Sequence, residues 1–133
     1  QDNRVIPLEG VVASSFTAAA RIALMDLVEA YIGQLPEGPR HAKLAQFEEH
    51  LSETRFCWIG GSGPTDPFYY RIQSPVVFIE FDHHPGLFLT NKDALKFHVH
   101  TVVRTPNGND YGVDLLRQHY HHRHLQGHGQ HAP

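Results

Sequence analysis

The stretch FYYRIQSPVVFIEFD, residues 68–82, decides the fold of this chain. It holds two runs rich in aromatic and β-branched residues, 68–73 and 76–82, separated by Ser74-Pro75, which is the composition of two β-strands and a turn. In the second run the apolar positions 77, 79 and 81 alternate with Glu80 and Asp82. Because successive side chains of a strand point to opposite faces, the alternation predicts one apolar and one polar face.

Two further strands are predicted on either side of this stretch. Residues 55–59 form one, ended by the turn-rich Gly60-Gly61-Ser62-Gly63-Pro64, and residues 98–104 form the other. We expect strand 76–82 to lie next to strand 98–104 or one strand away, because a polar face is costly to bury without a matching partner.

The residues before the strands read as helices. Thr17 is a candidate N-cap for a helix that runs to about Ile32, with Gly33 directly after it. A second helix is predicted from about Pro39, with an apolar stripe formed by Leu44, Phe47 and Leu51. Both helices are amphipathic, so each needs a sheet or a partner to cover.

These elements predict an α+β fold, with two N-terminal helices packed on a mainly antiparallel sheet of about four strands. A short C-terminal helix is expected over residues 113–120. Residues 121–133 are rich in His, Gly and Gln, so we expect a tail that is disordered unless a metal or a partner orders it. The domain is therefore assigned to residues 1–120 and the tail to 121–133.

Composition narrows the class of protein. The chain is 41% hydrophobic and 19% charged, as in an ordinary globular domain, and its net charge of −3 gives no basic footprint for nucleic acid. No apolar run approaches the roughly 20 residues needed to span a bilayer, and the first residues lack the apolar region of a signal peptide. We expect a soluble protein without membrane contact, and the compartment stays open because the single cysteine, Cys57, excludes an internal disulfide.

Histidine is the compositional anomaly, with ten of the 12 residues at or after His83. His98 and His100 stand at positions i and i+2 of a predicted strand, so both imidazoles point the same way and can reach one ion. Glu80 repeats that spacing with Asp82, and His119 follows on the last predicted helix. We predict that His98, His100, Glu80 and His119 bind a divalent transition metal, zinc, iron or copper, with Asp82 as a further or supporting ligand. The alternative is a polar sheet face whose groups bond one another.

A second group of residues could hold an anion. Arg71 and Arg104 lie on predicted strands, and Asp110 follows a turn at residues 106–109. Arginine binds carboxylate or phosphate in bidentate fashion, so these residues could hold a substrate or support the metal ligands. The alternative is a buried ion pair that stabilises the sheet, which is the commoner cause of such a pattern.

Several motifs resemble one known family. They occur in order across the chain, at residues 68–72, 79–82, 98–106, 109–112, 114–116 and 119–120. In this they resemble the domain of unknown function 3500 (DUF3500) family, and specifically its C-terminal half. The resemblance implies that the chain is a fragment, a processed product or a minimal member that dimerises in place of a missing N-terminal half. Phe97 departs from the family pattern, which usually has Asn before the His-x-His motif.

Three functions are consistent with these residues. The first is a metal-dependent enzyme, hydrolase or oxygenase-like, acting on a small or carboxylated substrate. The second is a noncatalytic assembly domain in which the polar cluster is a hydrogen-bond network. The third is a metal-sequestering protein that uses the histidines of the tail.

The resemblance to half of a family pattern also predicts association. The surface that a second half would cover should be apolar, drawn from the open sheet edge and from Phe68, Tyr70, Phe78 and Phe88. We expect a homodimer or a larger assembly in light scattering at micromolar concentration. A measured mass near 15.1 kDa, that of one chain, would contradict it.

Overall fold

The computed structural model describes residues 6–86, 94 and 98–106. The chain divides into two units, and the unit Pro7–Asn107 holds all the elements described below. The other unit, formed by Gln1–Ile6 and Gly108–Pro133, lies outside the described residues except for Ile6. The short helix predicted at 113–120 and the tail at 121–133 therefore lie outside them too.

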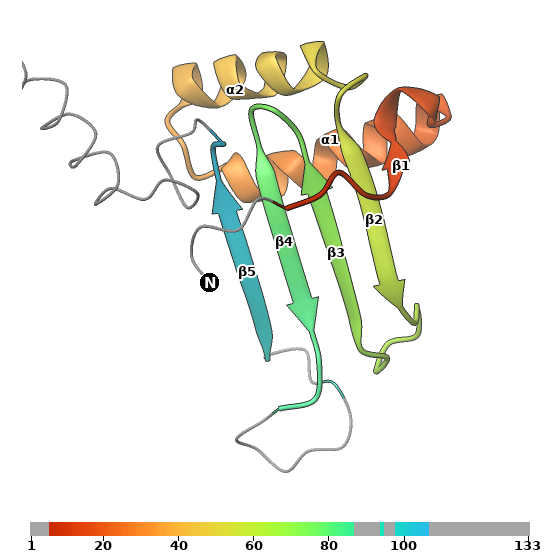
Figure 1. Ribbon diagram of the computed structural model, residues 1–133. Helices are drawn as coiled ribbons and strands as arrows, with labels where there is room; N and C mark the ends of the chain where they lie inside the picture. Colours follow the sequence, from red (N-terminus) through yellow and green to blue (C-terminus); the bar gives the residue numbers. More distant parts are fainter. Residues whose placement is uncertain (1–5, 87–93, 95–97, 107–133) are drawn as a thin grey trace, which may run out of the picture. The chain divides into compact units, whose positions relative to one another are not determined.

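The fold is α+β, as the sequence predicts (Figure 1). Two helices precede most of an antiparallel sheet whose five strands follow one another in sequence order. The elements are β1 (Val11–Val12), a 3-10 turn (Ala13–Ser15), α1 (Ala18–Ile32), α2 (Glu37–Glu49), β2 (Arg55–Gly60), β3 (Phe68–Gln73), β4 (Phe78–His83) and β5 (Val99–Arg104). The predicted adjacency of the strands around residues 76–82 and 98–104 is confirmed, because β4 pairs with β5.

The sheet has one strand more than predicted. β1 is only two residues long, too short to leave an alternating pattern in the sequence, and it pairs with Arg55 and Phe56 of β2. Gly10 makes this pairing possible with a φ of +96°, which glycine adopts without strain. A Cβ at this position would lie 2.2 Å from the carbonyl oxygen of Phe56, so no other residue fits here without movement.

The start of each helix is explained by residues in or next to its first turn. The hydroxyl of Thr17 accepts a hydrogen bond from the backbone N–H of Ala20 at 3.2 Å, which confirms Thr17 as the N-cap of α1. The second helix begins at Glu37, two residues before the predicted Pro39. Proline is tolerated anywhere in the first turn, because the N–H groups there have no partner within the helix.

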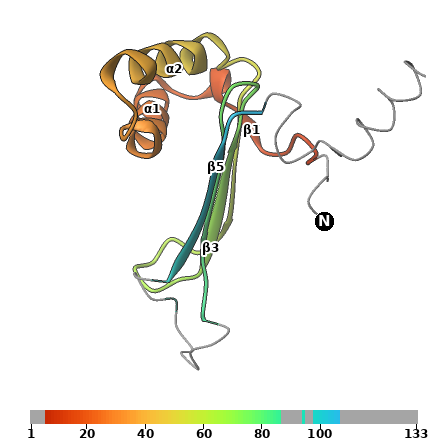
Figure 2. The ribbon, with the colours of Figure 1, turned by 90° about the vertical axis from the view of Figure 1, so that its left-hand side faces the viewer.

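The helices lie against one face of the sheet, over one end of its strands, as Figure 2 shows. The core between the two layers includes Val28 of α1, Phe47 of α2, and Ile72 and Ile79 of neighbouring strands, all four fully buried. Burial of this apolar surface is the main stabilising contribution to the fold.

Two side chains that the sequence assigns to an exposed apolar surface are buried. Tyr70 is 7% exposed and belongs to the core cluster beneath the helices, whereas Phe78 is 2% exposed on the opposite face of the sheet, with the guanidinium of Arg104 over its ring. Phe88 lies outside the described residues. Exposed apolar side chains occur instead along β5, at Val99, Val102 and Val103. Association of the chain stays a prediction.

Candidate metal site

The site is built by the pairing of β4 with β5. The two strands run antiparallel, with Asp82 directly opposite His100. Opposite residues in such a pair project to the same face of the sheet. Continuing the same pairing by two residues sets His84 opposite His98, so two i, i+2 pairs from neighbouring strands meet on one face.

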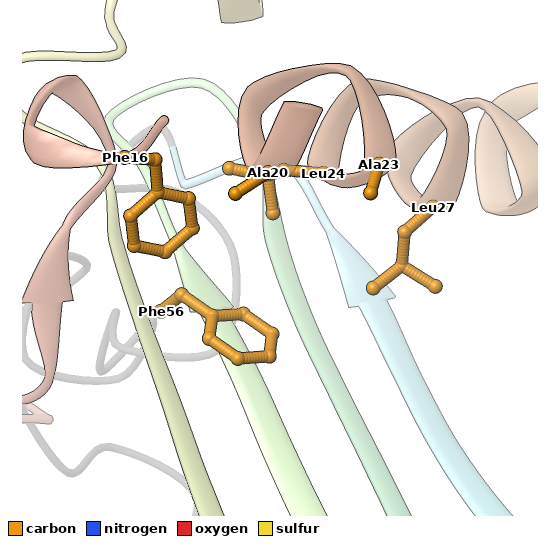
Figure 3. Close-up of a pocket in the computed structure, with 6 residues that line it drawn as sticks. All are labelled: Phe16, Ala20, Ala23, Leu24, Leu27 and Phe56. Atoms are coloured by element: carbon orange, nitrogen blue, oxygen red, sulfur yellow. The ribbon is translucent and has the colours of Figure 1, made fainter. Parts of the chain in front are cut away.

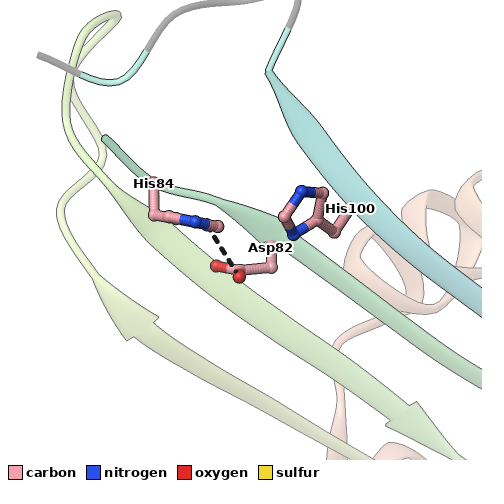
Figure 4. A group of neighbouring side chains, drawn as sticks. All are labelled: Asp82, His84 and His100. Atoms are coloured by element: carbon pink, nitrogen blue, oxygen red, sulfur yellow. Dashed lines mark ion pairs between the residues drawn. The ribbon is translucent and has the colours of Figure 1, made fainter. Parts of the chain in front are cut away.

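Three of these side chains converge closely enough to share an ion (Figure 4). Ligand atoms of Asp82, His84 and His100 all lie within 4.8 Å of one another. Nδ1 of His84 is 2.8 Å from Oδ2 of Asp82, an ion pair when the imidazole is protonated. Asp82 and His84 are half-buried and His100 is exposed, so the group is accessible from solvent.

His98 is the neighbour of this group of three. Its ring centroid lies 5.2 Å from the rings of both His84 and His100. Its Nδ1 atom is buried and has no hydrogen-bond partner within the part of the chain that the structure describes, although a buried ring nitrogen is normally satisfied. In the tautomer that carries its proton on Nε2, this nitrogen offers a lone pair to an ion beside three candidate ligands.

The structure keeps Glu80 apart from the three converging ligands. Glu80 lies opposite Val102, two pairs along the ladder from Asp82, and its Oε1 accepts a hydrogen bond from the Tyr69 hydroxyl at 2.5 Å. Burial raises the pKa of Tyr69, and the hydrogen bond to Glu80 raises it further, so this phenol stays protonated and remains the donor. The carboxylate that lies with the histidines is thus that of Asp82.

The two arginines singled out in the sequence lie away from the histidines. Arg71 is buried, and its Nη2 donates to Glu9 Oε2 at 2.8 Å and to the carbonyl oxygen of Pro7 at 3.3 Å. Burial lowers the pKa of Arg71, but the hydrogen bond to Glu9 and the charge interactions with Tyr69, Cys57 and Glu9 together outweigh this effect and leave the pKa raised. This arrangement matches the alternative stated in the sequence analysis, a structural ion pair that stabilises the sheet. The partner of Arg71 in this pair is Glu9, from the segment before β1.

Arg104 stands at the other end of β5 from His100. Its guanidinium carbon lies 4.3 Å from the centroid of the Phe78 ring, a cation–π contact. Arg104 lies four residues beyond His100 in the sequence, about 13 Å along the strand. Asp110 and His119 lie outside the described residues.

His84 is the candidate ligand that the sequence pattern did not single out. The His83-His84 pair directly follows a predicted strand and reads as a solvated loop pair. The spacing of Asp82-x-His84 could have identified His84 as a candidate ligand, because it repeats the i, i+2 geometry of His98-x-His100.

A separate pocket carries no ligating chemistry. It lies between α1 and the start of the sheet and has a volume of about 220 Å³ (Figure 3). Its lining residues are all apolar: Phe16, Ala20, Ala23, Leu24, Leu27 and Phe56. None of them can transfer a proton or bind a metal, so the His/Asp group remains the better candidate for chemistry.

Comparison with known proteins identifies a family and no activity. A family model described as a protein of unknown function (DUF3500) matches residues 1–113, most of the chain. No curated protein and no solved structure matches. Within the described residues, no helix has both the length and the apolar character needed to cross a membrane.

Proposed function

This chain belongs to the DUF3500 family, and we propose from the geometry of its own residues that it binds a divalent transition metal through Asp82, His84 and His100. The observation that carries the proposal is the convergence of their ligand atoms within 4.8 Å. Ligands of one zinc ion at bonds of about 2.1 Å stand about 3.4 Å apart in a tetrahedral shell. Because the three side chains are exposed or half-buried, changes in their rotamers could shorten the distances between ligand atoms from the observed range, within 4.8 Å, to about 3.4 Å around an ion.

The ligand types restrict the metal. Two imidazoles and one carboxylate are the donors of catalytic zinc sites and of the facial triad of non-haem iron. Both use three protein ligands and keep a coordination position for water or substrate. We therefore propose a metal-dependent enzyme, with a hydrolytic or oxygenase-like reaction at the open position.

His98 separates this proposal from the structural alternative. If His98 supplied a fourth protein ligand, the site would be closed in the manner of structural zinc centres. A closed site would favour the noncatalytic assembly domain. If His98 stays outside the shell, the ion keeps its open position.

Replacement of one ligand tests the site. In protein purified without a nickel column, we expect Zn²⁺ titration against a chromophoric chelator to detect one tight site that is absent from the His100→Ala variant. The matched control is His41→Ala, which removes an equally exposed histidine from α2, away from the site. Equal tight binding by the His100→Ala variant and the wild type would instead support sequestration by the histidines of residues 121–133.

Substitution of Co²⁺ for Zn²⁺ tests the open position. We expect azide to shift the visible d–d absorption of the Co²⁺-loaded chain, because an exogenous anion can bind only where a position is free. The same titration on the His98→Ala variant provides the comparison. A wild-type spectrum that ignores azide, together with a His98→Ala spectrum that responds, would identify a closed four-ligand centre.

A further inference from the structure

A second, chemically different cleft lies at the other end of β5. It opens between the two helices and the strand ends, with a volume of about 330 Å³. Its apolar walls are formed by Ile32, Leu35, Val77 and Val103. Ile32 and Val77 are buried at its base, whereas Leu35 and Val103 are 41% and 46% exposed at its rim.

Two cationic residues line this cleft, Lys43 and Arg104, and the guanidinium of Arg104 lies over the Phe78 ring. Lys43 of α2 is half-buried, and its Nζ donates to the carbonyl oxygen of Val76 at 3.2 Å and to the hydroxyl of Thr105 at 3.3 Å. Both acceptors are neutral, and among the described residues no carboxylate forms an ion pair with Lys43. An ammonium group has three N–H donors, so one remains for a further acceptor. A charge held in partly apolar surroundings without a counter-ion favours an anionic partner.

We propose that this cleft binds a small monocarboxylate with an aliphatic chain. The carboxylate accepts hydrogen bonds from Lys43 and from the Thr105 hydroxyl, and the chain lies against Leu35 and Val103. A volume of about 330 Å³ lies at the lower end of the range for small-molecule sites. One ammonium group beside apolar walls, with the guanidinium of Arg104 held over the Phe78 ring, suits a carboxylate better than a phosphate, which requires several donors.

The cleft is independent of the metal site. Val103 lies three residues beyond His100, about 10 Å along the strand, and no residue lines the cleft and also belongs to the His/Asp group. The proposal therefore does not depend on the proposed metal chemistry.

Calorimetric titration of the full chain with three probes tests the proposal. Octanoate carries both the charge and the chain, whereas 1-octanol lacks the charge and acetate lacks the chain. We expect octanoate to bind at least about tenfold more tightly than either, the order of one charge-assisted hydrogen bond or of the apolar contacts. Amide resonances of Leu35 and Val103 should shift on octanoate addition.

Single substitutions identify the side chain that is responsible for octanoate binding. Lys43→Met keeps the length of the side chain and should weaken octanoate binding at least about tenfold. Arg21→Met removes one exposed positive charge from α1 and should leave it unchanged. Val103→Phe narrows the cleft but keeps the charge, so it should also weaken binding even if Lys43→Met proves poorly folded.

Three results would overturn the proposal. The first is an absence of octanoate binding at millimolar concentration. The second is equal binding of octanoate and 1-octanol, which would leave no role for the charge. The third is octanoate binding that neither Lys43→Met nor Val103→Phe reduces, which would locate the ligand elsewhere.

Discussion

Replacing Asp82 with asparagine is expected to weaken Zn²⁺ binding by more than about 100-fold, because even substitutions outside the ligand shell cost 10–100-fold. The amide keeps the shape of the side chain but loses the negative charge, and its oxygen is a weaker metal ligand. The effect should be large because this carboxylate lies within reach of both His84 and His100.

Glu80→Gln is the matched control. It neutralises a carboxylate two residues earlier, on the same strand and the same face. Glu80 instead accepts the hydrogen bond of the Tyr69 hydroxyl, which an amide oxygen can still accept. We expect the Glu80→Gln substitution to change Zn²⁺ affinity by no more than about tenfold. The reverse ranking, with Glu80→Gln abolishing binding and Asp82→Asn tolerated, would restore Glu80 as the ligand that the sequence suggests.

Replacing Phe47 with alanine is expected to lower the free energy of unfolding by about 3–5 kcal/mol, the range for deletion of a buried aromatic ring. Phe47 is the buried residue of α2 and is 0% exposed. Its loss would leave a cavity between α2 and the rest of the core, which includes Val28 and Ile72. Equilibrium unfolding in urea measures the change.

Ile22→Ala supplies the comparison on the neighbouring helix. Ile22 belongs to α1 but is 63% exposed, so its truncation should change the free energy of unfolding by no more than about 0.5 kcal/mol. Comparable losses for the two variants would mean that α2 does not pack on the sheet as described.

The elements of this fold were largely predictable, for local reasons. The predicted strand at 68–73 coincides with β3, and the cap at Thr17 and the end at Ile32 match α1. Such boundaries depend on side chains within a few residues of each other. β1 was not predictable, because its two residues become a strand only by pairing with β2, more than 40 residues later.

The candidate site was predictable only in part. The His98-x-His100 motif is visible in the sequence, because i, i+2 spacing on a strand places both rings on one face. The choice between Glu80 and Asp82 was not, since both lie on the same face of β4 at that same spacing. The register of β4 against β5, with Asp82 opposite His100, brings one carboxylate to the histidines and leaves the other opposite Val102.

The sequence by itself therefore determined the class of fold, the order of the two helices and of strands β2 to β5, and the face of the sheet that carries the ionisable groups. These follow from periodicity, which each segment expresses alone. The tertiary structure alone decided which carboxylate meets the histidines, that His84 joins them, and that Lys43 meets Thr105 across 62 residues of chain. Those contacts depend on hydrogen-bond register and on packing between distant segments. Residue spacing within one segment carries no information about either.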